Sequence, residues 1–191
     1  MQLPVILLSA LALASSQGVR TPTAETEGIS VDAPATFVVG NRSNDGRINL
    51  VELVRPPETV DSWSELISVV TIMHATEGTT LNEFYPMWRD GYRGTCPGPN
   101  EAVARGTVDG RPALKATFHC PVDPQTGKPE SLTVIFIQGE VNLLSVQLAF
   151  RRSMTNADLA LVQKVQKTLK VCDARDNACF ARRATGFLSN G

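Results

Sequence analysis

Four cysteines are the residues of this chain best suited to covalent or metal chemistry. A zinc site would need Cys-x-x-Cys or His-x-x-x-His spacing, and the sequence has neither; only His74 and His119 are available as imidazole ligands. An even number of cysteines in an exported chain is typical of disulfides. We therefore expect two disulfide bonds, and neither a metal ion nor another cofactor.

The register of a predicted hairpin indicates how the cysteines pair. If the chain turns at Asp109-Gly110, Pro99 lies opposite Cys120, and Cys96 comes within reach of Cys120 after a small turn. The first disulfide is therefore predicted to join Cys96 and Cys120. The second, between Cys172 and Cys179, would close a local loop near the carboxyl terminus.

Sequence motifs of the common enzyme classes do not occur in this chain. It contains no G-x-S-x-G, P-loop, dinucleotide-binding glycine pattern or H-E-x-x-H. His119 could act as a general base with Glu101 or Glu130, which would make the protein a hydrolase with scattered catalytic residues. A lone strand histidine is usually structural, so we expect a protein that is not an enzyme.

Three lysines near the carboxyl end, Lys164, Lys167 and Lys170, form a candidate partner surface. They belong to a charge asymmetry: residues 17–90 carry five basic and eleven acidic side chains, whereas residues from 147 onward carry eight basic and three acidic ones. The alternative is a solvated helix face near a carboxyl terminus, where the dipole favours cations. No clustered basic and aromatic composition indicates a nucleic-acid partner.

Phe84, Trp88 and Tyr92 recur on one face of a predicted helix over Thr80–Tyr92, where they are candidate ligand-facing residues. The simpler interpretation is a core face against a sheet. Thr80 and Glu83 have the spacing of a capping box, which predicts where this helix begins. Pro86 is expected to kink the helix or separate its first turn.

Paired strands must position these side chains. Val, Ile, Phe and Thr alternate on either side of short turn dipeptides, which predicts antiparallel hairpins. Asp109-Gly110 favours a two-residue type I′ turn, and Gly139-Glu140 favours type II′. The expected hairpins are Ala35–Val39 with Arg47–Val54, Ala102–Val108 with Arg111–Cys120, and Ser131–Gln138 with Val141–Phe150.

One further strand and a closing helix complete the predicted elements. Glu65–Met73 is apolar on both faces, which is typical of a central strand covered on both sides. Thr155 and Asp158 cap a second helix, whose apolar stripe includes Val162, Val165 and Leu169.

The amino-terminal segment predicts export to the periplasm or secretion. Leu3–Ala14 is an apolar core too short to span a bilayer, and small residues follow it. We therefore assign residues 1–16 to a signal peptide, 17–33 to a flexible leader, 34–180 to one globular domain and 181–191 to a tail. No other segment approaches ~20 consecutive apolar residues, so no transmembrane segment is expected after signal removal.

The order of elements resembles that of the PsbP-like superfamily. The resemblance rests on residues 58–63, Glu-Thr-Val-Asp-Ser-Trp, leading into a strand, and on residues 144–151, Leu-Ser-Val-Gln-Leu-Ala-Phe-Arg, before the last helix. It covers roughly Ala33 to Val171 and implies an α+β fold: an antiparallel sheet of about six strands built from hairpins, with helices on both faces. The chain is also similar to small uncharacterised exported proteins of Gram-negative bacteria.

Members of the PsbP-like superfamily are mostly non-catalytic binding or assembly modules. The resemblance therefore implies a non-enzymatic exported domain that binds a protein partner or an envelope component. A carrier of a small apolar ligand is the first alternative, and the hydrolase is the second. The predicted disulfides depart from the PsbP pattern, so the resemblance assigns no functional residue.

Overall fold

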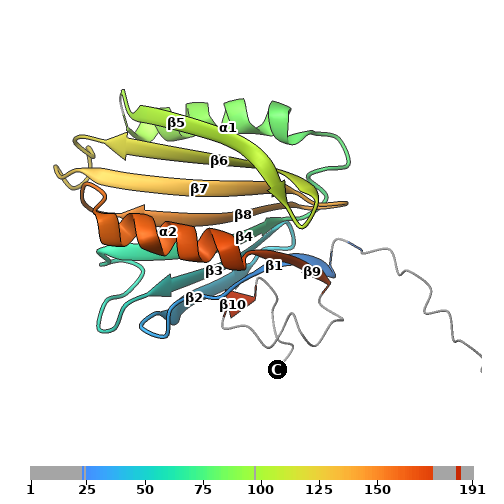
Figure 1. Ribbon diagram of the computed structural model, residues 1–191, viewed down its shortest axis with the longest axis horizontal. Helices are drawn as coiled ribbons and strands as arrows, with labels where there is room; N and C mark the ends of the chain where they lie inside the picture. The colour runs from blue at the N-terminus through green and yellow to red at the C-terminus, as the bar shows by residue number, and fades with distance from the viewer. Residues whose placement is uncertain (1–22, 24, 97, 174–183, 186–191) are drawn as a thin grey trace, which may run out of the picture.

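The structure is a computed structural model that describes residues 23, 25–96, 98–173 and 184–185. Figure 1 shows a large twisted sheet with a helix on each of its faces, and a smaller sheet beside it. The expected signal peptide and the remainder of the predicted tail outside 184–185 lie beyond the described residues.

Seven antiparallel strands form the large sheet, in the order β2-β3-β4-β8-β7-β6-β5. The sheet therefore has one strand more than the six expected, and β4 is central, as its apolar faces predict. The strands are β2 Val38–Asn44, β3 Ile48–Val54, β4 Glu65–Ile72, β5 Asn100–Val108, β6 Arg111–Cys120, β7 Glu130–Gln138 and β8 Leu143–Phe150.

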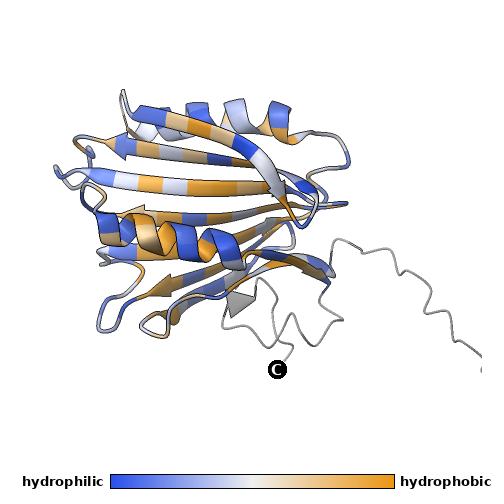
Figure 2. Ribbon diagram, viewed as in Figure 1, coloured by the Kyte–Doolittle hydropathy of each residue, from blue (hydrophilic) through white to orange (hydrophobic). Residues whose placement is uncertain are grey.

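The two helices of the described chain lie on opposite faces of this sheet. Alternate residues of β7 show the division: Phe136 belongs to the apolar cluster under α1, Leu81–Thr95, and Ile135 to the cluster under α2, Asn156–Thr168. Figure 2 shows the corresponding alternation of hydrophobic and hydrophilic segments along the strands and along α2. The expected α+β fold with helices on both faces is confirmed.

The smaller sheet corrects the expected leader and tail boundaries. It has the order β10-β1-β9, with β1 Glu27–Val31, β9 Lys170–Asp173 and β10 Ala184–Thr185. Every residue of β1 is buried, and its Ile29 and Val31 belong to the main core. Residues 27–33 are therefore part of the fold, although their polar composition has no apolar period.

Capping and turn chemistry behave as the sequence predicts at two sites. Thr80 and Glu83 form the full capping box of α1, which continues through Pro86 without interruption to Thr95. Asp109 and Gly110 have φ values of 49° and 76°, the two positive values that a type I′ turn requires. The first of the two long hairpins therefore has the predicted register.

The turn predicted at Gly139-Glu140 is wrong. Gln138 pairs with Leu143, so the loop contains four residues, and Gly139 donates its N–H to the Asn142 carbonyl at 2.9 Å. Gly139 is not in the positive-φ region that type II′ demands.

A side chain from β1 explains why this loop is wider than expected. The Glu27 carboxylate, 1% exposed, accepts backbone N–H bonds from Glu140 at 2.6 Å, Val141 at 2.9 Å and Asn142 at 2.8 Å. Successive N–H groups that converge on one anion are a common way to satisfy a buried carboxylate. Glu27 therefore joins the smaller sheet to the end of β7 and β8.

Candidate functional site

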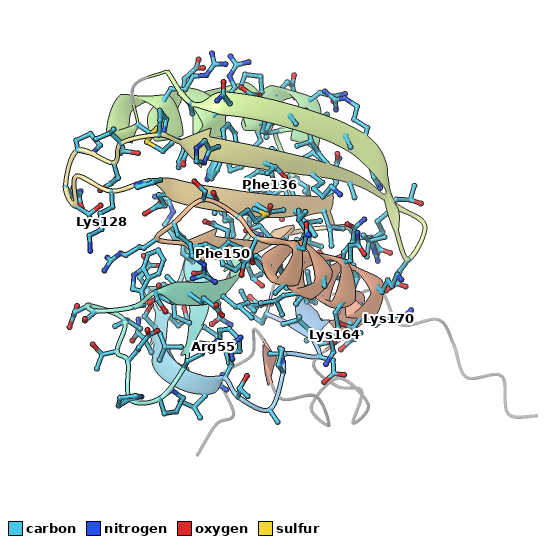
Figure 3. The ribbon with its side chains drawn as sticks, turned by 60° about the vertical axis from the view of Figure 1, so that its left-hand side comes forward. Arg55, Lys128, Phe136, Phe150, Lys164 and Lys170 are labelled. Atoms are coloured by element: carbon cyan, nitrogen blue, oxygen red, sulfur yellow. A yellow bond between two sulfur atoms is a disulfide. The ribbon has the colours of Figure 1, made fainter. Side chains whose placement is uncertain are left out.

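The predicted lysine surface, Lys164, Lys167 and Lys170, is divided between two elements. Lys164 and Lys167 lie on α2 and are exposed, and neither forms an ion pair with any residue in the described ranges. Lys170 is not helical, because α2 ends at Thr168 and Lys170 begins β9. Figure 3 shows Lys164 and Lys170 on one side of the molecule, and Lys128 on the other.

Lys170 has an acidic partner far away in the sequence. Its Nζ lies 2.9 Å from Oδ1 of Asp109, in the β5–β6 turn, and Asp109 Oδ2 accepts the Val171 N–H at 2.9 Å. The carboxylate thus holds the start of β9 against this turn and offsets the charge of Lys170. The net positive charge of the surface comes mainly from Lys164 and Lys167, which we call the α2 patch.

The outer face of α2 has no exposed acidic side chain. Its one carboxylate, Asp158, is buried, whereas Leu159 is 47% exposed. On the adjacent β6, Lys115 lies 3.3 Å from Gln166 and adds a further cation beside the helix. The exposed surface of α2 therefore carries lysines and one exposed large apolar side chain.

A partly buried ionic network holds the amino-terminal end of α2 in position. Arg152 Nη2 lies 2.7 Å from Asp158 Oδ1 and 2.5 Å from Glu65 Oε1, and Arg55 Nε binds the other oxygen of Glu65 at 2.5 Å. Burial alone would raise the pKa of Asp158, but bonds from the Thr155 N–H and hydroxyl, with the charge of Arg152, lower it. The α2 patch thus rests on a helix whose first turn is anchored to β4.

Sequence reasoning missed this network because its members come from distant segments. Arg55 follows β3, Glu65 begins β4, and Arg152 follows β8. The spacing of Thr155 and Asp158 predicted the cap, but no local signal indicates which arginine approaches it.

The aromatic stripe of α1 packs against the sheet. Ring centroids of Trp88 and Phe136 are 5.1 Å apart, those of Phe84 and Phe136 are 5.5 Å apart, and those of Tyr92 and Phe118 are 4.7 Å apart. Burial raises the pKa of Tyr92 to about 12. This packing agrees with the core interpretation, and the ligand-facing role of Phe84, Trp88 and Tyr92 stays a prediction.

A cavity of about 600 Å³ opens elsewhere on the molecule, between the beginning of α1 and the strands β5 and β6. Its lining includes Leu81, Arg105 and Gln138, and none of the three stripe aromatics. Leu81 already donates its N–H to the Gln138 side chain at 3.1 Å.

His119 is separated from the carboxylates proposed as its partners. In the register of β5, β6 and β7, His119 lies opposite Asn100 and Ser131, so Glu101 and Glu130 fall on the other face of the sheet. Its Nδ1 lies 3.2 Å from Ser131 Oγ, which in turn donates to the Arg152 carbonyl. The structure therefore does not assemble the acid–base pair that the hydrolase hypothesis needs.

The remaining sequence-predicted residues have clear positions. Cys96 and Cys120 form the expected disulfide; Cys179 lies outside the described residues, so its pairing with Cys172 stays a prediction. Within the described ranges no group of three or more His, Cys, Asp or Glu side chains is arranged to hold a metal ion. No helix there has the length and apolar character needed to cross a membrane.

Comparison with known proteins identifies the fold. No protein-family profile matches the chain, and no curated protein sequence does. Among solved structures, LpqN of Mycobacterium tuberculosis is 13% identical with a TM-score of 0.52, covering 78% of this chain and 85% of LpqN. A Mog1 mutant is 12% identical with a TM-score of 0.50, covering 76% of this chain and 92% of Mog1.

The cyanobacterial PsbP of Synechocystis is a third similar structure, 12% identical with a TM-score of 0.47, covering 83% of this chain and 98% of that protein. The matches to LpqN and Mog1 span most of each chain at very low identity. They therefore show that this chain shares its fold with LpqN and Mog1, and they concern the fold alone.

Proposed function

We propose that this chain, with the fold that it shares with LpqN and Mog1, is a non-enzymatic exported domain that binds an acidic protein partner in the cell envelope through the α2 patch. The observation that carries the proposal is the outer face of α2, where Lys164 and Lys167 are exposed three residues apart and the helix exposes no acidic side chain.

The charge pattern of α2 differs from that of an ordinary solvated helix. Such helices usually alternate opposite charges three or four residues apart, because these pairs stabilise the helix slightly. Lys164 and Lys167 are instead like charges three residues apart, which costs a few tenths of a kcal/mol. An acidic partner would relieve this repulsion. The exposed side chain of Leu159 offers an apolar contact on the same helix.

The anchoring of α2 favours binding. Arg152 and Asp158 fix its first turn, and Val162 and Val165 are buried in the core. A helix that is already ordered loses little conformational freedom when a partner docks on it. The patch is thus presented on a rigid element.

Two observations support an exported location. The Cys96–Cys120 disulfide is typical of an oxidising compartment, and the apolar segment Leu3–Ala14 has the length of a signal-peptide core. LpqN, which shares the fold, is described as involved in cell envelope biogenesis. We propose the same compartment for this chain.

The test is site-specific cross-linking in intact source cells. A photoreactive residue replaces Gln163, an exposed residue of α2 next to Lys164, and the captured protein is identified by mass spectrometry. Its affinity for the purified domain is then measured for the wild type, Lys164→Glu/Lys167→Glu and the control Lys128→Glu, an exposed lysine on the opposite side of the molecule.

We expect the double reversal to weaken binding about tenfold or more, since rim charges steer and hold complementary partners, and the control to bind like the wild type. Equal binding by all three proteins would remove the α2 patch from the proposal. Equal loss in the double variant and in Lys128→Glu would indicate non-specific charge attraction instead of a docking surface.

A further inference from the structure

Strand β5 leaves one long edge of the large sheet open. Among the residues that the structure describes, β6 is its only neighbour, and seven of its nine residues are exposed. Open strand edges are templates for pairing, so proteins usually protect them with prolines, lysines or bulges. The opposite edge, β2, has a register shift between Val39 and Asn41, whereas the β5–β6 ladder is regular.

The turn at Asp109-Gly110 determines which backbone groups of β5 face outward. In a two-residue hairpin the pair next to the turn, here Val108 and Arg111, exchanges both of its hydrogen bonds, and the pattern then alternates. Even-numbered residues of β5 therefore bond to β6. Glu101, Val103 and Arg105 direct their N–H and C=O groups away from the sheet.

We propose that β5 pairs in antiparallel fashion with β5 of a second copy of this chain, about a two-fold axis at Val103. In this register Val103, whose side chain is 44% exposed, lies opposite its own equivalent. Glu101 of each copy lies opposite Arg105 of the other, which gives two opposite-charge cross-strand pairs. The seven-stranded sheets of the two copies would then join into one.

Charge complementarity selects this register over its neighbours. A shift by two residues in one direction places Glu101 opposite Val103, and a shift in the other direction places Glu101 opposite Thr107. Neither shifted register pairs Glu101 with a cation. The self-complementary register is also isologous, as a closed two-fold dimer requires.

The side chains at the edge are already held on one face. The Glu101 carboxylate accepts the Tyr85 hydroxyl at 2.6 Å and an Arg93 N–H at 2.7 Å, and Arg105 donates to the Asn82 side chain. A guanidinium has five N–H donors, so Arg105 keeps donors for a partner. On the other face the facing residues would be Ala102 and Ala104, which are too small to obstruct a neighbouring strand.

The resulting contact is small and partly ionic. Interfaces of limited area are usually weak and reversible. Exposed charge pairs lose strength as salt screens them. We therefore expect a dimer whose dissociation constant rises with ionic strength. The α2 patch lies on another element, so Lys164→Glu/Lys167→Glu should dimerise like the wild type.

Complementary charge reversals test the register. Glu101→Arg and Arg105→Glu are each examined alone and then mixed in equal amounts by analytical ultracentrifugation. Alone, each variant places like charges opposite one another, and its dissociation constant should rise about tenfold or more. Mixed, the two variants place two positive positions opposite two negative ones, so a heterodimer should form. A folding defect in either variant cannot produce this rescue.

Two substitutions at the axis test the strand pairing itself. Val103→Pro removes an outward N–H that does not bond to β6, so it should abolish the dimer and leave the fold intact, while the control Val103→Thr dimerises. Val103→Cys should form an intermolecular disulfide on oxidation, because Cα atoms of a hydrogen-bonded antiparallel pair lie ~5.5 Å apart. Thr107→Cys, distant from its equivalent in this register, should not.

A wild-type protein that sediments as a monomer at every attainable concentration would overturn the proposal. So would cross-linking of Thr107→Cys as fast as Val103→Cys, since it would indicate a different register or random collision. A monomer that instead adds an extended peptide of another protein along β5 would also overturn it, and would assign the edge to strand addition by a partner.

Discussion

Glu27 is the buried side chain whose replacement best tests how the smaller sheet is held to the large one. Its carboxylate is the acceptor for three successive N–H groups of the loop between β7 and β8. Arg111 Nη1 lies 3.5 Å from the same carboxylate. Replacement by glutamine preserves the size of the side chain and removes one acceptor oxygen and the negative charge.

The expected loss of unfolding free energy follows from the hydrogen bonds that the two Glu27 carboxylate oxygens accept. One accepts the Glu140 N–H at 2.6 Å, and the other accepts those of Val141 and Asn142 at 2.9 Å and 2.8 Å. Whichever way the glutamine amide turns, its NH2 group faces at least one of these donors. An unpaired buried donor costs about 1–3 kcal/mol, and loss of charge-assisted bonding adds to this. We expect Glu27→Gln to reduce the free energy of unfolding by about 2–4 kcal/mol.

Glu140→Gln is a matched control. It makes the same chemical change beside the same arginine, since Glu140 Oε1 lies 3.0 Å from Arg111 Nη2, but the Glu140 side chain is 48% exposed. Exposed ion pairs contribute about 0–1 kcal/mol, so the control should lie within that range of the wild type. Urea unfolding of the three proteins gives the comparison directly.

Amide hydrogen exchange identifies the bonds responsible. In Glu27→Gln the amides of Val141 and Asn142 or that of Glu140 should lose protection, and the amides in the middle of β7 should keep theirs. An unfolding free energy for Glu27→Gln equal to that of Glu140→Gln would refute the reasoning. So would unchanged protection of all three loop amides, because the carboxylate would then not be their essential acceptor.

Three further outcomes are expected. Gly139→Ala should destabilise the fold by about 1–3 kcal/mol in urea unfolding, because its Cβ would overlap a Glu27 carboxylate oxygen; a neutral result would contradict that overlap. Cys96→Ser/Cys120→Ser should lose about 3.5 kcal/mol on the chain-entropy model for a 24-residue separation, measured against wild type under non-reducing conditions. Glu130 has its pKa raised by burial and by a nearby carboxylate, so wild-type stability should fall as pH rises from the ordinary glutamate pKa through this raised value. In thermal melts, Glu130→Gln should therefore match the wild type at acid pH and exceed it at neutral pH; a difference independent of pH would contradict this assignment.

Part of the candidate site was predictable from the sequence. Helical periodicity placed Lys164 and Lys167 off the apolar stripe of α2, and both are exposed. The same reasoning placed Lys170 on that helix, whereas it begins β9 and pairs with Asp109. Its ion pair with Asp109 spans 61 residues of sequence, and helix periodicity contains no information about such a contact.

Features that depend only on neighbouring residues follow directly from the amino-acid sequence. Asp109-Gly110 supplied the positive φ values of a tight hairpin, and that turn set the register that brings Cys120 near Cys96. Thr80 and Glu83 likewise satisfied each other's backbone groups at the start of α1. These choices are local, so a short segment of sequence contains the whole physical reason for them.

Which polar side chains are buried depends on contacts between segments that are far apart in the sequence. Glu27 lies in a segment without apolar periodicity, yet it is buried because three N–H groups more than a hundred residues away satisfy its charge. His119 could not be assigned partners until the strand register placed Glu101 on the other face. Burial of a polar group depends on donors and acceptors that folding brings together, and sequence spacing does not record which ones will meet.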